Sequence, residues 1–174
     1  MDFRTHLVES STKDILASDK VFLLIIGGSA SGKNYIHNKY FSKIELVDVD
    51  EITKELSGGD FEKARKMVSK AISIANKEVE KYFQDGKSVA QVSTGSGDKA
   101  VSNKLKKAQE AGFETALVLI DVDVKKAIKR NEERAAQGKQ GLIPDWKVEK
   151  TNQAARETFN KVKSEATYSL VIKN

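Results

Sequence analysis

Apolar residues along the chain gather in five short runs, separated by longer stretches of mixed polarity. The strongest run is Val21–Ile26, and weaker runs follow at residues 44–49, 88–92, 116–122 and 168–172. A continuous apolar run of this length is typical of a parallel strand that is buried on both faces of its sheet. The pattern therefore predicts five strands.

Between these runs, apolar residues recur at the three- and four-residue spacings of amphipathic helices. Helices are predicted at residues 3–17, 33–41, 51–56, 61–83, 99–111, 123–136 and 145–165. Strands that alternate with such helices predict a three-layer α/β fold with a parallel sheet and right-handed crossovers. We expect one domain over residues 1–174, with residues 1–19 as an N-terminal helical extension.

A glycine-rich loop lies between the first predicted strand and the following helix. Its spacing, G-x-x-x-x-G-K, is that of a P-loop, in which backbone N–H groups and the helix N-terminus converge on phosphates. The lysine reaches the β- and γ-phosphates. The alternative is a glycine-rich turn without a ligand. The predicted nucleotide-binding residues are Gly27, Gly28, Ser29, Ala30, Ser31, Gly32, Lys33 and Asn34.

Asn34 stands at the loop position where a Ser or Thr hydroxyl normally ligates Mg²⁺. An amide oxygen is also a suitable ligand for this hard cation, so Asn34 is the predicted metal ligand. The alternative is that water and phosphate oxygens alone complete the metal shell.

Two carboxylates follow the second predicted strand. Strand alternation would place Asp48 and Asp50 on one face, at the sheet edge where ligands of parallel sheets bind. A carboxylate there can accept the proton of an attacking hydroxyl, so Asp50 is the predicted catalytic base and Asp48 a substrate contact. The alternative is that Asp50 only caps the helix 51–56.

A basic helix follows the fourth predicted strand and leads into a polar loop with two glycines, residues 137–144. Arg130 and Arg134 are four residues apart, so they share a face and could both contact phosphate. An arginine carried by a mobile lid would stabilise the charge that develops during phosphoryl transfer. The alternative is that both arginines pair with Asp123, Glu132 or Glu133 on the surface.

Composition narrows the chemistry further. The chain has no cysteine and only two histidines, which excludes disulfides, thiolate nucleophiles and histidine-rich metal centres. No apolar run is long enough to cross a bilayer, so we expect a cytoplasmic protein without membrane contacts. Residues 124–174 carry 12 Lys or Arg and 6 Asp or Glu, against a net charge of +5 for the chain. A nucleic acid is therefore a candidate partner, and solvated lysine-rich helix faces are the alternative.

Together these segments resemble the zeta-toxin-like P-loop kinases. The resemblance covers residues 21–174 and includes the P-loop, Val47-Asp48-Val49-Asp50, Ser93-Thr94-Gly95, and Arg130 to Arg134 leading to Pro144. The chain is most similar to the small members found in tailed-phage genomes, and more distantly to polynucleotide kinases.

The resemblance implies a five-stranded parallel sheet in the order 2-3-1-4-5 and the use of ATP with Mg²⁺. It implies that Lys33 contacts phosphate, that Asp50 is the catalytic base, and that Arg130 and Arg134 belong to an arginine-bearing lid. Thr94 and Gly95 would contact the acceptor, a hydroxyl of a nucleotide, nucleotide-sugar or nucleic acid. Phage members include enzymes that phosphorylate hydroxymethyl pyrimidines in DNA, which would place the protein in the host cytoplasm.

Four positions depart from the family pattern. Asn34 replaces the hydroxyl residue, Val92 an acidic residue, Ser96 an arginine and Lys139 a lid arginine. These departures keep open a nucleotide-binding regulatory module without transfer activity. A third hypothesis, an ATP hydrolase, would need Asp121 or Asp123 in a Walker-B role. The acceptor and the oligomeric state are not indicated by the sequence.

Overall fold

The computed structural model describes residues 3–174, so the first two residues of the predicted N-terminal extension lie outside the described residues. Five strands form one sheet: β1 (Val21–Ile26), β2 (Glu45–Val47), β3 (Val89–Ser93), β4 (Glu114–Asp121) and β5 (Tyr168–Lys173). All neighbouring strands are parallel, and their order is β2-β3-β1-β4-β5. The predicted fold class and strand order are therefore confirmed.

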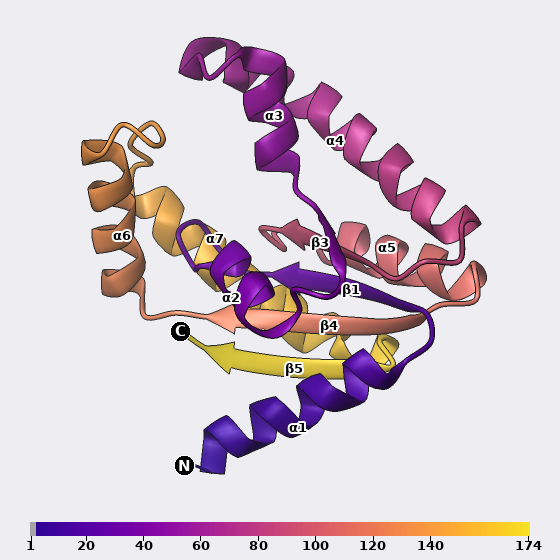
Figure 1. Ribbon diagram of the computed structural model, residues 1–174. Coiled ribbons are helices and arrows are strands. Elements are labelled where there is room, and N and C mark those ends of the chain that lie inside the picture. Colours follow the sequence, from indigo (N-terminus) through magenta and orange to yellow (C-terminus); the bar gives the residue numbers. More distant parts are fainter. Residues whose placement is uncertain (1–2) are drawn as a thin grey trace.

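The helices lie in the intervals between the strands (Figure 1). They are α1 (Phe3–Ala17), α2 (Lys33–Tyr40), α3 (Val49–Ser57), α4 (Phe61–Gln84), α5 (Asp98–Glu110), α6 (Val124–Ala136) and α7 (Asp145–Val162), followed by a short 3₁₀ turn at Lys163–Glu165. No helix within residues 3–174 is long and apolar enough to cross a membrane.

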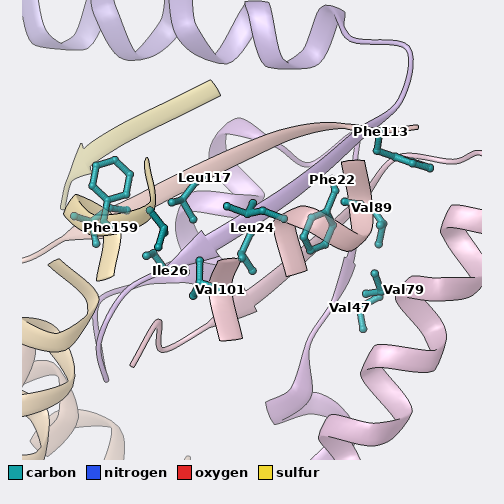
Figure 2. Packing of buried hydrophobic residues seen from close by; sticks show 14 of the residues in the cluster. Phe22, Leu24, Ile26, Val47, Val79, Val89, Val101, Phe113, Leu117 and Phe159 are labelled. Carbon is teal, nitrogen blue, oxygen red and sulfur yellow. The ribbon is translucent and has the colours of Figure 1, made fainter. Parts of the chain in front are cut away.

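Strand β1 is buried on both faces, as its unbroken apolar sequence predicts. Phe22, Leu24 and Ile26 belong to a core that includes residues of α4, α5 and α7 on one face of the sheet, and Figure 2 shows these side chains gathered there. Val21, Leu23 and Ile25 belong to a second core on the other face, with residues of α1 and α2. The sheet is thus the middle of three layers.

The carboxyl ends of the central strands meet at one edge. Ile26, the last residue of β1, pairs with Ser93 of β3 and with Leu119 of β4. In Figure 1, α3 and the start of α4 lie above the carboxyl ends of the strands, and α6 lies to the left of them. The loop that follows β1 therefore lies between these elements, where open parallel sheets bind their ligands.

Most predicted boundaries differ from the observed ones by one or two residues, and these differences shorten the second strand most in proportion to its length. The run at residues 44–49 contains only the three-residue strand β2, because the chain turns into α3 directly after Val47. The last predicted helix also ends early, at Val162, where the 3₁₀ turn begins.

Candidate functional site

The loop between β1 and α2 has the backbone geometry of an anion cradle. Ala30 and Gly32 have left-handed φ angles of 57° and 91°. Gly32 is the N-cap of α2, and no side chain accepts from the first N–H groups of that helix. These N–H groups are free to bind an anion, whose charge the helix dipole also stabilises.

Lys33 crosses this loop with its side chain. Its Nζ donates to the carbonyl oxygens of Gly27 at 2.8 Å and Gly28 at 3.0 Å. Burial lowers the pKa of Lys33 to about 8, while the carboxylates of Asp50 and Asp48 act in the opposite direction. Lys33 is thus a mostly charged ammonium at neutral pH, held at the loop without a direct ionic partner.

Ser31 supplies a second polar group without a partner. Its side chain is fully buried, and its hydroxyl has no hydrogen-bond partner among the described residues. Buried polar groups in native proteins are nearly always satisfied, so an orphan hydroxyl inside this loop calls for a ligand atom or water. The uncapped helix, the orphan hydroxyl and Lys33 together fit the phosphates of a nucleotide.

Helix α7 supports the loop from behind, through two residues that the sequence analysis did not select. Thr151 Oγ1 accepts from the backbone N–H of Ser29 at 3.0 Å and donates to Ser29 Oγ at 3.2 Å. Asn152 Nδ2 donates to the carbonyl oxygen of Ser29 at 3.1 Å, and Asn152 is only 3 % exposed. Asn152 could have been found from the sequence, because it is a polar residue four positions after Val148 on the apolar face of this helix.

The contact between Gly28 and α7 leaves no space for a side chain. A Cβ atom at Gly28 would lie 2.3 Å from Asn152 Cγ and 2.4 Å from its backbone nitrogen. We therefore expect Gly28→Ala to lower the free energy of unfolding by about 1–3 kcal/mol, because the loop and α7 must separate. Urea denaturation measures this effect. Gly141→Ala is the matched control, since a Cβ there meets nothing within 4 Å; equal losses in both variants would contradict the predicted overlap.

The two carboxylates after β2 are arranged differently from the prediction. Asp48 is the N-cap of α3, with its Oδ1 accepting from the backbone N–H of Asp50 at 2.9 Å. The hypothesis that Asp50 is the cap is therefore wrong, and so is the placement of both residues on one face of a strand. The strand ends at Val47 because Asp48 already caps the next helix, where its side chain binds the N–H of Asp50.

Asp50 lies instead in the first turn of α3, on the wall of a cleft. Desolvation by the surrounding protein raises the pKa of Asp50, although the residue is exposed to solvent in the cleft, and the negative charge of Asp48 raises this pKa further. The positive charges of Lys33 and Arg134 act in the opposite direction. A carboxyl group in this setting accepts a proton more readily than an ordinary aspartate.

Asn34 connects the loop to the capping aspartate. Its Nδ2 donates to Asp48 Oδ2 at 2.5 Å, and the carbonyl oxygen of the amide accepts no hydrogen bond from the described residues. No group of three or more Asp, Glu, His or Cys side chains is arranged to hold a metal within residues 8–174, whose side chains are described. Mg²⁺ needs fewer protein ligands than that, because it binds through one or two carboxylates together with phosphate and water oxygens. Asn34, Asp48 and Asp50 fit such a partial shell.

The two arginines of α6 lie next to the loop. Arg130 donates to the carbonyl oxygen of Ser31 at 3.4 Å and to Asn174 Oδ1 at 3.3 Å, and Asn174 Nδ2 donates to the same Ser31 oxygen at 2.7 Å. Neither Arg130 nor Arg134 forms an ion pair with a carboxylate among the described residues. Asp123 instead caps α6, and Glu133 pairs with Lys129. Surface pairing therefore does not account for these arginines.

Two hollows lie next to the phosphate loop, one on each side of Arg134. One is a cleft of about 650 Å³, lined by Asn34, Asp48, Asp50, the start of α4 at Phe61 and Ala64, and the segment 138–141. The other, of about 370 Å³, lies over Gly32 and is lined by Tyr35, Arg130, Gln137 and Asn174. Arg134 lines both. Their volumes are those of small-molecule sites.

Thr94 and Gly95 follow β3 but line neither of these hollows. Thr94 is exposed and shares a hydrogen bond with Ser96 at 3.2 Å. Gly95 has a φ of 67° and packs so closely on Ile26 that a Cβ would lie 2.8 Å from the isoleucine Cβ. In this conformation, Gly95 has a structural role in the turn, and the predicted substrate contacts are not brought together with Asp50.

A larger hollow of about 760 Å³ lies at the opposite, amino-terminal ends of the strands. Its charged residues are Asp14, Asp19, Lys20 and Glu114. The excess of carboxylates repels phosphate, and parallel sheets bind ligands at the other edge. Size alone therefore does not identify the site.

The loop 137–144 is held at its far end by Asn131, a buried residue between the two arginines. Asn131 Nδ2 donates to the carbonyl oxygen of Ile143 at 2.8 Å, and Asn131 Oδ1 accepts from Gln140 Nε2 at 2.9 Å and from the N–H of Ile143 at 3.2 Å. One side chain thus closes the loop back onto α6.

Asn131→Ala is expected to release this loop and to lower the free energy of unfolding by about 1–3 kcal/mol, because buried groups lose their partners. Hydrogen exchange of the amides in residues 138–143 should become faster, while exchange in β1 changes only with global stability. Glu132→Ala, on the exposed side of α6, is the control. Unchanged exchange in the loop of the Asn131 variant would contradict this role.

Three solved structures share this fold at low sequence identity. A "putative kinase" from Chloroflexus aurantiacus J-10-fl aligns with a TM-score of 0.66 and 15 % identity, over 90 % of this chain and 86 % of that chain. A structure of the PezAT toxin–antitoxin system of Streptococcus pneumoniae aligns with a TM-score of 0.67 and 16 % identity, over 98 % and 77 %. The AvrRxo1-ORF1:-ORF2 complex with ATP aligns with a TM-score of 0.66 and 15 % identity, over 92 % and 58 %.

At such identities these structures show a shared fold and no more. No curated protein sequence matches the chain. The sequence itself gives the stronger assignment, because residues 22–167 match a family described as the AAA domain. This match extends from β1 to the start of β5 and includes the loop, the capping aspartate and both arginines. The chain therefore belongs to the AAA domain family, with the P-loop kinase-like fold that its solved neighbours share.

Proposed function

We propose that the protein is an ATP-dependent phosphotransferase that moves the γ-phosphate to a hydroxyl group of an acceptor bound in the cleft of about 650 Å³. One observation carries this proposal: Asp50 and Arg134 line the same cleft as Asn34, which directly follows Lys33 of the phosphate loop. A hydrolase needs space only for a water molecule beside the γ-phosphate. The cleft instead has the volume of a small-molecule site, which favours a larger acceptor.

The proposed reaction assigns a task to each group. Asp50 accepts the proton of the acceptor hydroxyl while its oxygen attacks the γ-phosphorus. The bond between this phosphorus and the β–γ bridging oxygen breaks, and ADP leaves with that oxygen. Lys33 and Arg134 stabilise the negative charge on the phosphoryl oxygens, and the loop N–H groups hold the β-phosphate. Mg²⁺, held by Asn34 together with phosphate and water oxygens, would neutralise charge on the β- and γ-phosphates.

Arg130 would act on the nucleotide side. It lies with Tyr35 and Asn174 around the second hollow, next to the loop carbonyl of Ser31. When ATP binds, its guanidinium can exchange the long hydrogen bonds to Ser31 and Asn174 for charge-assisted bonds to phosphate. The segment 137–144 would cover the cleft as a lid, since Gly138, Lys139, Gln140 and Gly141 line it.

The acceptor is tested with γ-labelled ATP and a panel of nucleosides, nucleotides, nucleotide-sugars, and DNA with or without hydroxymethyl pyrimidines. The last substrate tests the likeness to small phage kinases and the basic C-terminal third of the chain. Label on one acceptor class supports the proposal and identifies the substrate. Label that remains on ATP, or appears only as free phosphate, would overturn it.

A nucleotide-binding module without transfer activity is the second candidate. It is favoured by Asn34, which stands where a hydroxyl residue is usual and whose amide nitrogen donates to Asp48. A hydrolase is less well supported. Asp121 is held by ion pairs with Arg156 and Lys173, and Asp123 caps α6, so neither carboxylate is free for a Walker-B role. ATP binding without any labelled product would favour the regulatory module.

A further inference from the structure

A separate hollow of about 340 Å³ lies between α4 and α5, over the sheet. Its apolar wall is formed by Phe22 of β1 and by Ile72, Val79 and Phe83 of α4. Figure 2 shows Phe22 and Val79 on this side of the sheet. Phe22 is near the start of β1, whereas the phosphate loop follows the end of that strand, so this hollow is distinct from the site described above.

Six polar or charged residues also line this hollow, namely Asn76, Glu80, Gln91, Asn103, Lys104 and Lys107, and two of them are hydrogen-bonded to each other. Gln91 of β3 is 1 % exposed, and Lys104 of α5 donates from its Nζ to Gln91 Oε1 at 2.5 Å. This bond fixes the orientation of the amide, because an ammonium group can only face the oxygen. The Gln91 Nε2 group is consequently left buried without an acceptor. An unsatisfied buried donor destabilises the folded protein, so an acceptor supplied by a ligand would relieve that cost.

Lys104 has no carboxylate partner. The nearby Glu80 on the rim forms its ion pair with Lys107, at 3.5 Å. Burial alone lowers the pKa of Lys104 to about 8, with no opposing charge. A half-buried ammonium and a buried amide N–H group thus lie side by side, and both lack an anionic acceptor among residues 3–174.

We propose that this hollow binds a small carboxylic acid with an aromatic or branched apolar body. One carboxylate oxygen would accept from Lys104, and the other from Gln91 Nε2 once the buried amide shifts toward the hollow, which satisfies both donors with a single charge. The apolar body would pack on Phe22, Ile72, Val79 and Phe83. A phosphate ligand is disfavoured, because Lys107 is paired with Glu80 and the remaining ammonium of Lys104 cannot balance two negative charges. The proposal is independent of the function proposed for the P-loop site.

Phenylacetate is a suitable probe, with phenylacetamide as its uncharged counterpart. In ¹H–¹⁵N NMR spectra of the full chain, phenylacetate should shift the Gln91 side-chain amide and the amides of Val79 and Lys104 in a saturable manner. A ligand of this size is expected to bind with a Kd of about 1 mM. Phenylacetamide should bind at least tenfold more weakly, because it offers no charge to Lys104.

Two variants locate the site. Lys104→Met should weaken phenylacetate binding at least tenfold, whereas Lys99→Met, which removes an exposed lysine of the same helix outside the hollow, should leave it unchanged. If Lys104→Met does not fold, the double variant Gln91→Leu/Lys104→Met replaces the polar pair by apolar groups and serves instead. Absence of saturable shifts, equal binding of the amide, or unchanged binding in these variants would overturn the proposal. ATP binding, measured in parallel, should not change in any of them.

Discussion

Replacing Lys33 by methionine is expected to lower kcat/KM for phosphotransfer by about two to three orders of magnitude, the usual effect of removing one charged group from a transferring phosphoryl group. ATP binding should weaken at least tenfold, because a charge-assisted contact to the phosphates is lost. The fold should survive. Methionine fills a similar volume. The substitution also removes the charge whose desolvation lowers the pKa of Lys33 to about 8. Calorimetry with ATP and the labelled-transfer assay measure both effects.

The pH dependence of stability separates this effect from misfolding. The unfolded chain still binds a proton on Lys33 between about pH 8 and 10.5, whereas the folded protein has released it. The stability of the parent protein should therefore gain from this residue as the pH rises through that window, and Lys33→Met should lose this gain. Lys39→Met, an exposed position on the same helix, is the control. A Lys33→Met protein that binds ATP as tightly as the parent would contradict the phosphate-binding role of the loop.

Asp50→Asn is expected to lower kcat by at least two orders of magnitude while ATP binding is retained, because the amide cannot accept the acceptor proton. The same change should raise the melting temperature at neutral pH. The raised pKa of Asp50 means that its ionised form is disfavoured in the folded protein by desolvation and by Asp48. Stability contributed by this residue is present below its ordinary pKa and is lost as the pH rises through the raised value, so an uncharged amide avoids that loss.

The activity profile gives a further test of Asp50. Its raised pKa should move the acid limb of kcat against pH above the range of an ordinary aspartate. Glu55→Gln, on α3 but outside the cleft, should change neither the rate nor this limb. Full transfer activity in Asp50→Asn would exclude the proposed base. ATP binding in a parent protein without any transfer would instead point to the regulatory module.

Asp48 and Asp50 are expected to differ in their roles because their hydrogen bonds differ. Asp48 is committed to capping α3 and to holding Asn34, so its carboxylate is already satisfied at both oxygens. Asp50 has no such partners and faces the cleft. Two aspartates that are equivalent in sequence are therefore divided between a structural and a candidate chemical role by a single helix boundary. Deleting Asp48 should affect folding of α3 as well as the site.

Several features of the fold could be predicted from sequence because they depend on local pattern. The uninterrupted run Val21–Ile26 fixes a strand buried on both faces, and the three- and four-residue spacings in residues 61–83 fix α4 almost to the residue. The phosphate loop is predictable for the same reason, since glycines at fixed spacing between a strand and a helix encode its backbone. The strand order came from the family resemblance and is confirmed.

What the sequence pattern could not supply are the contacts made between distant segments. The hydrogen bonds of Thr151 and Asn152 to Ser29 join residues more than a hundred positions apart. The packing of Gly28 against α7 likewise exists only once the layers are assembled. Asp48 caps α3 directly after Val47, so the strand ends there. The alternation of polar and apolar residues alone does not predict this boundary. Hydrophobic periodicity and loop chemistry, which act within a few residues, are determined by the sequence alone. The partner of each buried polar group, and thus which carboxylate is left free to react, is decided only by the tertiary structure, because desolvation and pairing depend on neighbours that folding brings together.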